Sequence, residues 1–254
     1  MIKVSVKILS LYAIILLSSC NGTLEKQKET KYMTASQILG NPKYLAISYG
    51  GYREKTRDIQ PTINELKEDM KILNAMGIKI LRTYNVHFEQ TSTLLKAIDE
   101  LMKEDVDFEM FLMLGAWIDC ENAFNSGNGE PNHNEESERN PVEIAAAVSL
   151  AKTYPHIVKI IAVGNEAMVK WATNYFVQPR VILKWVDHLQ NLKKTGELPK
   201  DLWITSSDNF ASWGGGGAEY HVEDLEKLIH AVDSFQCIHT LCMTHIIIPF
   251  FGVF

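Results

Sequence analysis

Asn165 and Glu166 are the residues whose types and position most plainly suggest chemistry. They follow the run 158–163, in which five of six residues are apolar and most are β-branched. Such a run is typical of a strand covered on both faces of a parallel sheet. Active sites of parallel α/β folds lie where the strands end. The pair is therefore a candidate site, and a polar loop after a core strand remains the alternative.

Other polar and aromatic residues follow the other predicted strands. They are Tyr49, Tyr84, Asn85, Trp117, Asp208, Asn209 and His239. If the strands are parallel, their carboxyl ends meet at one rim, and we expect these side chains to gather near Glu166. Structural alternatives stay open: Trp117 as packing, Asp208 with Asn209 as a turn cap, and His239 as a hydrogen-bonded core histidine.

Strand and helix patterns alternate along most of the chain. The predicted strands are 43–50, 78–86, 108–118, 158–163, 202–206 and 234–239. The predicted helices are 61–76, 91–103, 141–154, 181–194 and 222–232, and a long polar loop covers 119–139. This alternation implies an α/β fold with a parallel sheet and right-handed crossovers.

A doubly wound sheet and a barrel both satisfy this alternation. No Gly-rich phosphate fingerprint follows the first predicted strand, which disfavours a nucleotide-binding sheet. The polar strand ends favour a (β/α)8 TIM barrel. About six βα units are present, so we expect an incomplete barrel over residues 41–254.

Composition and charge limit the classes of partner. The chain has 254 residues, 46% of them hydrophobic, and a net charge of -6. The acidic balance, with no basic stripe, argues against a nucleic-acid partner. Three cysteines, Cys120, Cys237 and Cys242, have spacings that fit no zinc pattern. We expect no metal, no cofactor and no disulfide framework.

The amino-terminal residues predict export. Lys3 and Lys7 precede and flank a short apolar run that ends in Leu-Ser-Ser before Cys20. This pattern resembles a bacterial lipoprotein signal over 1–20, with Cys20 as the lipidated residue. An ordinary cleaved signal or an uncleaved anchor is the alternative. We expect residues 21–40 to form a polar tether and the protein to lie in the cell envelope, on a membrane through its lipid; a periplasmic or secreted protein is the alternative.

Three segments resemble glycoside hydrolase family 17, which comprises β-1,3-glucanases and glucanosyltransferases. They are Ile-Ser-Tyr-Gly at 47–50, Met-Gly-Ile-Lys-Ile-Leu-Arg-Thr-Tyr-Asn at 76–85 and Ala-Val-Gly-Asn-Glu-Ala at 162–167. The resemblance covers about residues 43–240, mostly as a pattern of strands and helices. The segments 76–85 and 162–167 are the parts of the match that are specific to the family. The amino terminus places it nearer to bacterial lipoproteins of the family.

The resemblance implies a retaining mechanism with two carboxylates and a β-glucan substrate. Glu166 would be the general acid/base, and Asn165 would bind the sugar 2-hydroxyl. Tyr84 would line the site, and Trp117 would stack on a glucose ring. Substrate hydroxyls would lie near Asp208, Asn209 and His239.

The sequence departs from the family after the last predicted strand. The family carries its nucleophile, a second Glu, at the end of the seventh strand, but this chain has no Asp or Glu after Asp233. We therefore expect a truncated and inactive form with exposed strand edges and low stability. A one-base shift of reading frame just after Thr240 would account for the unusual apolar tail. A genuinely short protein whose apolar tail packs or pairs with a partner is the alternative.

Two other functions remain open at this stage. One is a lipoprotein that binds glycan without cleaving it. The other is a different barrel glycosidase with the same Asn-Glu strand end, such as a β-1,4-mannanase or a cellulase.

Overall fold

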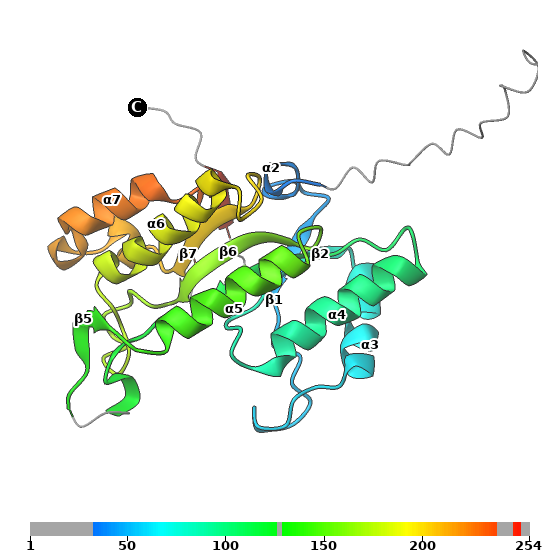
Figure 1. Cartoon of the computed structure of the whole chain (residues 1–254), viewed down its shortest axis with the longest axis horizontal. Coiled ribbons are helices and arrows are strands. Elements are labelled where there is room, and N and C mark those ends of the chain that lie inside the picture. Colours follow the sequence, from blue (N-terminus) through cyan, green and yellow to red (C-terminus); the bar gives the residue numbers. More distant parts are fainter. Residues whose placement is uncertain (1–32, 126–128, 238–245, 250–254) are drawn as a thin grey trace, which may run out of the picture. The chain divides into compact units, whose positions relative to one another are not determined.

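The computed structural model describes residues 33–125, 129–237 and 246–249 (Figure 1). The predicted signal segment, Cys20 and His239 lie outside these residues. The described chain belongs to one compact unit that begins at Met33.

A single large sheet organises this unit. Its order is β1-β2-β3-β6-β7-β8-β9, and every neighbouring pair from β1 to β8 is parallel. The parallel strands are β1 (Leu45–Ser48), β2 (Ile78–Arg82), β3 (Phe111–Ala116), β6 (Val158–Asn165), β7 (Trp203–Asp208) and β8 (Ser234–Cys237). The structure thus confirms the α/β class and the parallel sheet.

Five helices connect these strands and follow one another across the view in chain order (Figure 1). They are α3 (Ile63–Ala75), α4 (Glu89–Glu104), α5 (Asn140–Thr153), α6 (Pro179–Thr195) and α7 (Glu223–Ala231). Local signals fix their ends. Thr62 and Glu65 form a capping box at the start of α3. Gly196 takes the left-handed conformation that ends α6.

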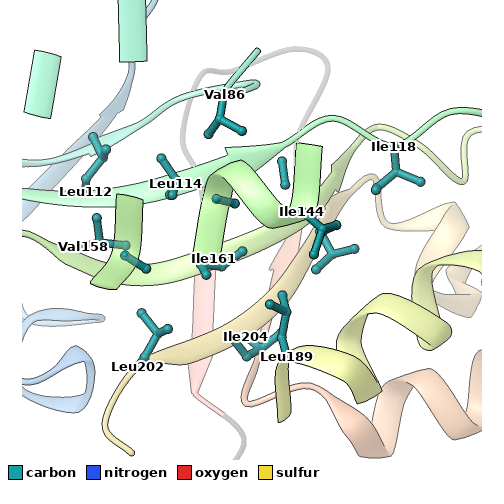
Figure 2. Close-up of a cluster of buried hydrophobic side chains, with 14 of the residues drawn as sticks. Val86, Leu112, Leu114, Ile118, Ile144, Val158, Ile161, Leu189, Leu202 and Ile204 are labelled. Atoms are coloured by element: carbon teal, nitrogen blue, oxygen red, sulfur yellow. The ribbon is translucent and has the colours of Figure 1, made fainter. Parts of the chain in front are cut away.

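The strands and the helices share an outer core (Figure 2). Leu112 and Leu114 of β3 belong to it, and so do Ile144 of α5 and Leu189 of α6. These side chains are buried because the helices cover the outer face of the sheet. Alternate residues of each strand point to opposite faces, so the remaining strand residues must pack elsewhere.

A separate inner core collects those remaining residues. Its strand members come from β2, β3 and β6: Ile80, Phe111, Met113, Ile160 and Ala162. With helices outside and a second apolar cluster inside, the sheet is curled like part of a barrel wall. The fold is therefore a mixed α/β fold with a curled parallel sheet, consistent with an incomplete barrel.

A short helix, α2 (Ala35–Ile38), completes the inner core. Ala35 and Ile38 are fully buried, and Leu39 is nearly so. The polar tether was predicted to extend over residues 21–40. Residues 35, 38 and 39 instead pack in the inner core. Small and apolar residues at 35, 38 and 39 give this segment a buried face. This pattern is too short to be recognised in the sequence, because it directly follows a polar stretch.

The carboxyl-terminal side of the sheet also differs from the prediction. The strand β9 (Ile246–Pro249) pairs antiparallel with β8, so β8 is not an edge strand. The predicted loop 119–139 contains a small antiparallel pair, β4 (Cys120–Glu121) and β5 (Asn132–Glu136), and a short turn at Ala123–Asn125. The described helices include none that is long and apolar enough to cross a membrane.

Candidate active site

Glu166 stands at the turn that follows β6. It has a φ of 48°, an uncommon backbone conformation for a residue with a side chain. Its backbone N–H donates to the carbonyl of Ser207 at 2.7 Å, which ties the turn to β7. Its side chain is half-buried. A tight turn held against the neighbouring strand thus fixes where the carboxyl leaves the sheet.

Arg82, the last residue of β2, holds Asn165 in place. Its guanidinium donates to Asn165 Oδ1 and, at 3.4 Å, to Ser48 Oγ. The guanidinium carbon also lies 5.0 Å from the centre of the Tyr84 ring. Burial lowers the pKa of Arg82, while Tyr84, Glu166 and Asp208 act in the opposite direction. The sequence prediction did not include Arg82, although a charged residue at the end of an apolar strand was a usable signal.

Asp208 lies near Glu166 but is closed off from solvent. One carboxylate oxygen accepts from the backbone N–H of Met168 at 2.8 Å, and the other accepts from Ser206 Oγ at 2.8 Å. Burial is the main cause that raises the pKa of Asp208 to about 6, and the charge of Glu166 adds to the rise. Asp208 therefore anchors the loop after β6 and is not positioned to touch a substrate.

Asn209, the next residue, has a local role. Its Oδ1 accepts from the backbone N–H of Ser212 at 2.9 Å. This is the turn cap that the sequence left open as an alternative. Tyr84, by contrast, is half-buried beside Arg82 at the same end of the sheet as Asn165.

Tyr175 links the acid to the aromatic residues of the rim. Burial raises the pKa of Tyr175, and the charges of Glu166 and Asp208 add to the rise. Its ring centre lies 5.3 Å from that of Trp117 and 5.4 Å from that of Phe124. Tyr175 was missed because it occupies an irregular loop between β6 and α6, where periodicity gives no signal.

Trp117 borders a cleft of about 710 Å³ at the ends of β2 and β3. The residues around this cleft are Arg57, Asn85, His87, Phe88, Trp117, Asp119, Phe124, Glu138, Arg139, Val142 and Glu143. Its volume falls in the range of pockets that hold small-molecule ligands. Glu166 does not line this cleft, and the Tyr175 ring packs against Trp117 at its border.

In the described part of the chain, no group of three or more His, Cys, Asp or Glu side chains is arranged to hold a metal ion. Cys120 is a free, buried thiol whose pKa is raised by burial. The chemistry that these residues offer is that of a carboxyl, an amide and aromatic rings, which suits a neutral, hydroxyl-rich ligand.

Comparison with known proteins finds a similar solved structure. No family model and no curated protein matches the chain. The chain is similar to the crystal structure of an endo-laminarinase from Formosa Hel1_33_131, with 69% sequence identity and a TM-score of 0.79. The match covers 81% of this chain and 52% of that one. The chain thus spans about half the length of this relative.

Proposed function

We propose that this domain acts on β-1,3-glucan of the laminarin type as part of a glycoside hydrolase. The observation that carries the proposal is the 69% identity to an endo-laminarinase over 81% of the chain. The resemblance of residues 76–85 and 162–167 to glycoside hydrolase family 17 supports the same substrate class.

Glu166 is the general acid/base in this proposal. A retaining glycosidase protonates the leaving glycosidic oxygen with one carboxyl group, which later takes a proton from water. Glu166 is half-buried and is held at a fixed turn, so its carboxyl can reach a bound sugar from the rim. Arg82 occupies Asn165 Oδ1, which leaves the Nδ2 end of that amide to donate to the sugar 2-hydroxyl.

The nucleophile requires a second carboxylate roughly 5 Å from the first. Asp208 is close to Glu166, but it is fully buried and both of its oxygens already accept hydrogen bonds. We therefore propose that Asp208 is not the nucleophile. The family resemblance places that residue after position 240, where the given sequence has no Asp or Glu.

Binding and turnover are tested separately on the 254-residue chain. We expect the chain to bind laminarihexaose in isothermal titration calorimetry and to release no reducing ends from laminarin. Glu166→Gln should bind with an affinity within about threefold of the parent, since it removes a proton donor and keeps the shape. Failure of the parent to bind laminarihexaose would contradict the substrate class.

A glycan-binding protein that does not cleave is the second candidate function, and the burial of Asp208 favours it because Asp208 cannot serve as a nucleophile. A sugar donor with an activated leaving group distinguishes this candidate from an enzyme. With α-laminaribiosyl fluoride, an acceptor hydroxyl oxygen attacks C1, the C–F bond breaks and fluoride leaves. The acceptor proton passes to the Glu166 carboxylate. We expect fluoride release and longer oligosaccharides from the parent chain and neither from Glu166→Gln. Equal rates for both chains would contradict the role of Glu166.

Cleavage of mannan or cellulose, without action on laminarin or on the fluoride, would instead indicate another barrel glycosidase.

We also propose that Cys20 carries a lipid that holds the protein on the bacterial cell envelope. The basic start, the short apolar run and Leu-Ser-Ser-Cys support this proposal. Metabolic labelling with a fatty acid should mark the parent chain and should not mark Cys20→Ser. Equal labelling of both would contradict lipidation at this residue.

A further inference from the structure

The loop between β6 and α6 begins with Glu166 and folds back on itself. The backbone N–H of Val177 donates to the carbonyl of Ala167, the residue after Glu166, at 2.7 Å. Tyr175, two residues before Val177, therefore belongs to a segment that is tied to the immediate neighbour of the proposed acid/base. Burial raises the pKa of Tyr175, and the charges of Glu166 and Asp208 add to the rise, which agrees with this geometry.

The ring of Tyr175 is packed, while its hydroxyl is available to a ligand. The ring contacts those of Trp117 and Phe124. The side chain is half-buried, and among the residues that the structure describes none forms a hydrogen bond with its hydroxyl. A phenol hydroxyl in such surroundings usually has a partner, because leaving it unpaired costs free energy. A sugar hydroxyl fits this place, since both groups donate and accept.

Three backbone hydrogen bonds tie the segment 174–178 to β4, β5 and the turn between them. Named from donor to acceptor, they run from Cys120 to Tyr175 at 3.2 Å, from Phe124 to Asn174 at 2.8 Å and from Gln178 to His133 at 2.9 Å. These bonds reach both ends of the segment. The backbone that carries Tyr175 is therefore held by elements that lie more than forty residues earlier in the chain.

His133 of β5 adds a side-chain contact to the residue next to Tyr175. Its Nδ1 lies 2.8 Å from the carbonyl oxygen of Phe176. Because a carbonyl oxygen only accepts, Nδ1 carries a proton and donates. The rings of His133 and Phe176 are also stacked, with centres 3.6 Å apart and planes inclined by 14°. One side chain thus fixes both the backbone and the ring of Phe176.

Polar bonds to α6, and no core of its own, hold β5 in place. Its sequence, Asn-His-Asn-Glu-Glu, contains no apolar residue, and Asn and Glu are poor strand formers. Arg180 Nε and Nη2 donate to the carbonyl of Asn134 at 3.0 and 2.6 Å. Trp185 Nε1 donates to Glu136 Oε2 at 2.6 Å. The strand that presents His133 is therefore anchored on a helix of the core, as a positioning element must be.

We propose that Tyr175 is a substrate-binding residue whose hydroxyl bonds to a glucan hydroxyl, and that His133 is the positioning residue that holds Tyr175 in place. The glucan part rests on the proposed function, whereas the positioning part rests on the contacts of His133. His133 acts through Phe176, whose peptide bond adjoins Tyr175. Loss of His133 should therefore weaken binding only as far as the Tyr175 hydroxyl contributes to it.

Affinity for laminarihexaose, measured by isothermal titration calorimetry, tests both roles. Tyr175→Phe keeps the ring and removes the hydroxyl, so it should weaken the Kd about threefold to tenfold, the usual effect of one hydrogen bond. His133→Ala should give a loss of similar size. His133→Asn retains a donor near the position of Nδ1 and should recover most of that loss. His230→Ala, a change at an exposed histidine of α7, is the matched control and should leave the Kd unchanged.

The double variant Tyr175→Phe/His133→Ala shows whether His133 acts through Tyr175. If it does, the loss of the double variant should lie within about twofold of the larger single loss, because the second change has nothing further to remove. An effect of His133 that is independent of Tyr175 would make the two single losses multiply. Multiplied losses, or a parent Kd in Tyr175→Phe, would contradict the proposal. If melting temperatures show that His133→Ala fails to fold, His133→Phe replaces it, since it keeps a stacked ring and removes the donor.

Hydrogen exchange measures the positioning without a ligand. In His133→Ala the amides of residues 174–178 should exchange at least about threefold faster than in the parent, and in His230→Ala they should not change. Unchanged exchange in His133→Ala would show that His133 does not position this segment. If the parent binds laminarihexaose and Tyr175→Phe binds it equally well, this inference is wrong and the glucan assignment stands. If the parent does not bind laminarihexaose, the proposed function falls, and the role of Tyr175 in glucan binding falls with it.

Discussion

At the residue scale, two carboxylates at neighbouring strand ends have opposite surroundings. Glu166 is half-buried at the rim, whereas Asp208 is fully buried beneath it. Sequence position made both candidates for substrate contact. Burial and hydrogen bonds from Met168 and Ser206 give Asp208 a structural role instead.

This environment predicts a pH-dependent contribution of Asp208 to stability. Burial raises its pKa from 3.8 to about 6, so between these values the folded state holds a proton that the unfolded chain releases. The contribution is therefore complete below pH about 4 and is lost as the pH rises through about 6. Its size is about 3 kcal/mol. Asn cannot titrate, so the Asp208→Asn variant lacks this pH-dependent contribution to stability.

Urea unfolding at pH 4, 5, 6 and 7 measures this effect. The parent should be more stable relative to Asp208→Asn at pH 4 than at pH 7, by about 3 kcal/mol. Asp107→Asn, a change at an exposed loop residue, serves as the control and should differ little from the parent at each pH. A difference between parent and Asp208→Asn that is constant across the series would contradict the assignment.

At the element scale, one residue of α5 joins the ends of two strands. Glu143 Oε1 accepts from the backbone N–H of Val86, after β2, at 2.7 Å and from that of Trp117, after β3, at 2.9 Å. Helix propensity and periodicity place Glu143 on the first turn of α5. Only the packing of α5 against the sheet brings its carboxylate to these two loops.

Glu143→Ala should lower the free energy of unfolding by about 3 kcal/mol, because it leaves buried N–H groups without an acceptor. Glu143→Gln keeps one oxygen and should cost about 1 kcal/mol. Denaturant unfolding measures both. Glu104→Ala is the control, because Glu104 is 56% exposed and pairs with Lys67 on the surface, so its effect on the free energy of unfolding should be small. Similar losses for Glu143→Ala and Glu104→Ala would show that the buried acceptor has no special role.

At the scale of the folded unit, the curled sheet needs its two apolar faces covered by different segments. The helices α3 to α7 cover the outer core, and α2 contributes to the inner core. Ile38 is fully buried against that inner core, which includes Ile80 and Phe111. The segment before the first strand is therefore part of the domain.

Ile38→Ala should lower the free energy of unfolding by about 2–5 kcal/mol, the usual cost of truncating a buried aliphatic side chain. Ile72→Ala, at a position that is 59% exposed, is the matched control and should change it by less than about 0.5 kcal/mol. Thermal or urea unfolding of both variants measures these changes in the free energy of unfolding. If Ile38→Ala is as stable as Ile72→Ala, then α2 does not stabilise the inner core.

The sequence alone determined the alternation of strands and helices and the position of Glu166. Periodicity of apolar residues located all five helices α3 to α7 to within one or two residues. The apolar run 158–163 ending in Asn-Glu identified the strand end that presents Asn165 and Glu166. These features are local, since they depend on residues near one another in the chain.

Tertiary structure decided which of the strand-end residues lie at the surface of the site and what holds them. It buried Asp208, brought Arg82 to Asn165, packed the Tyr175 ring against Trp117, and brought the carboxylates of Asp119 and Glu143 to the N–H groups of Trp117. These partners are distant in sequence or lie in irregular loops, so no local pattern encodes their contacts. The curl of the sheet and the packing of the helices fix those distances, and that is why they appear only in the folded chain.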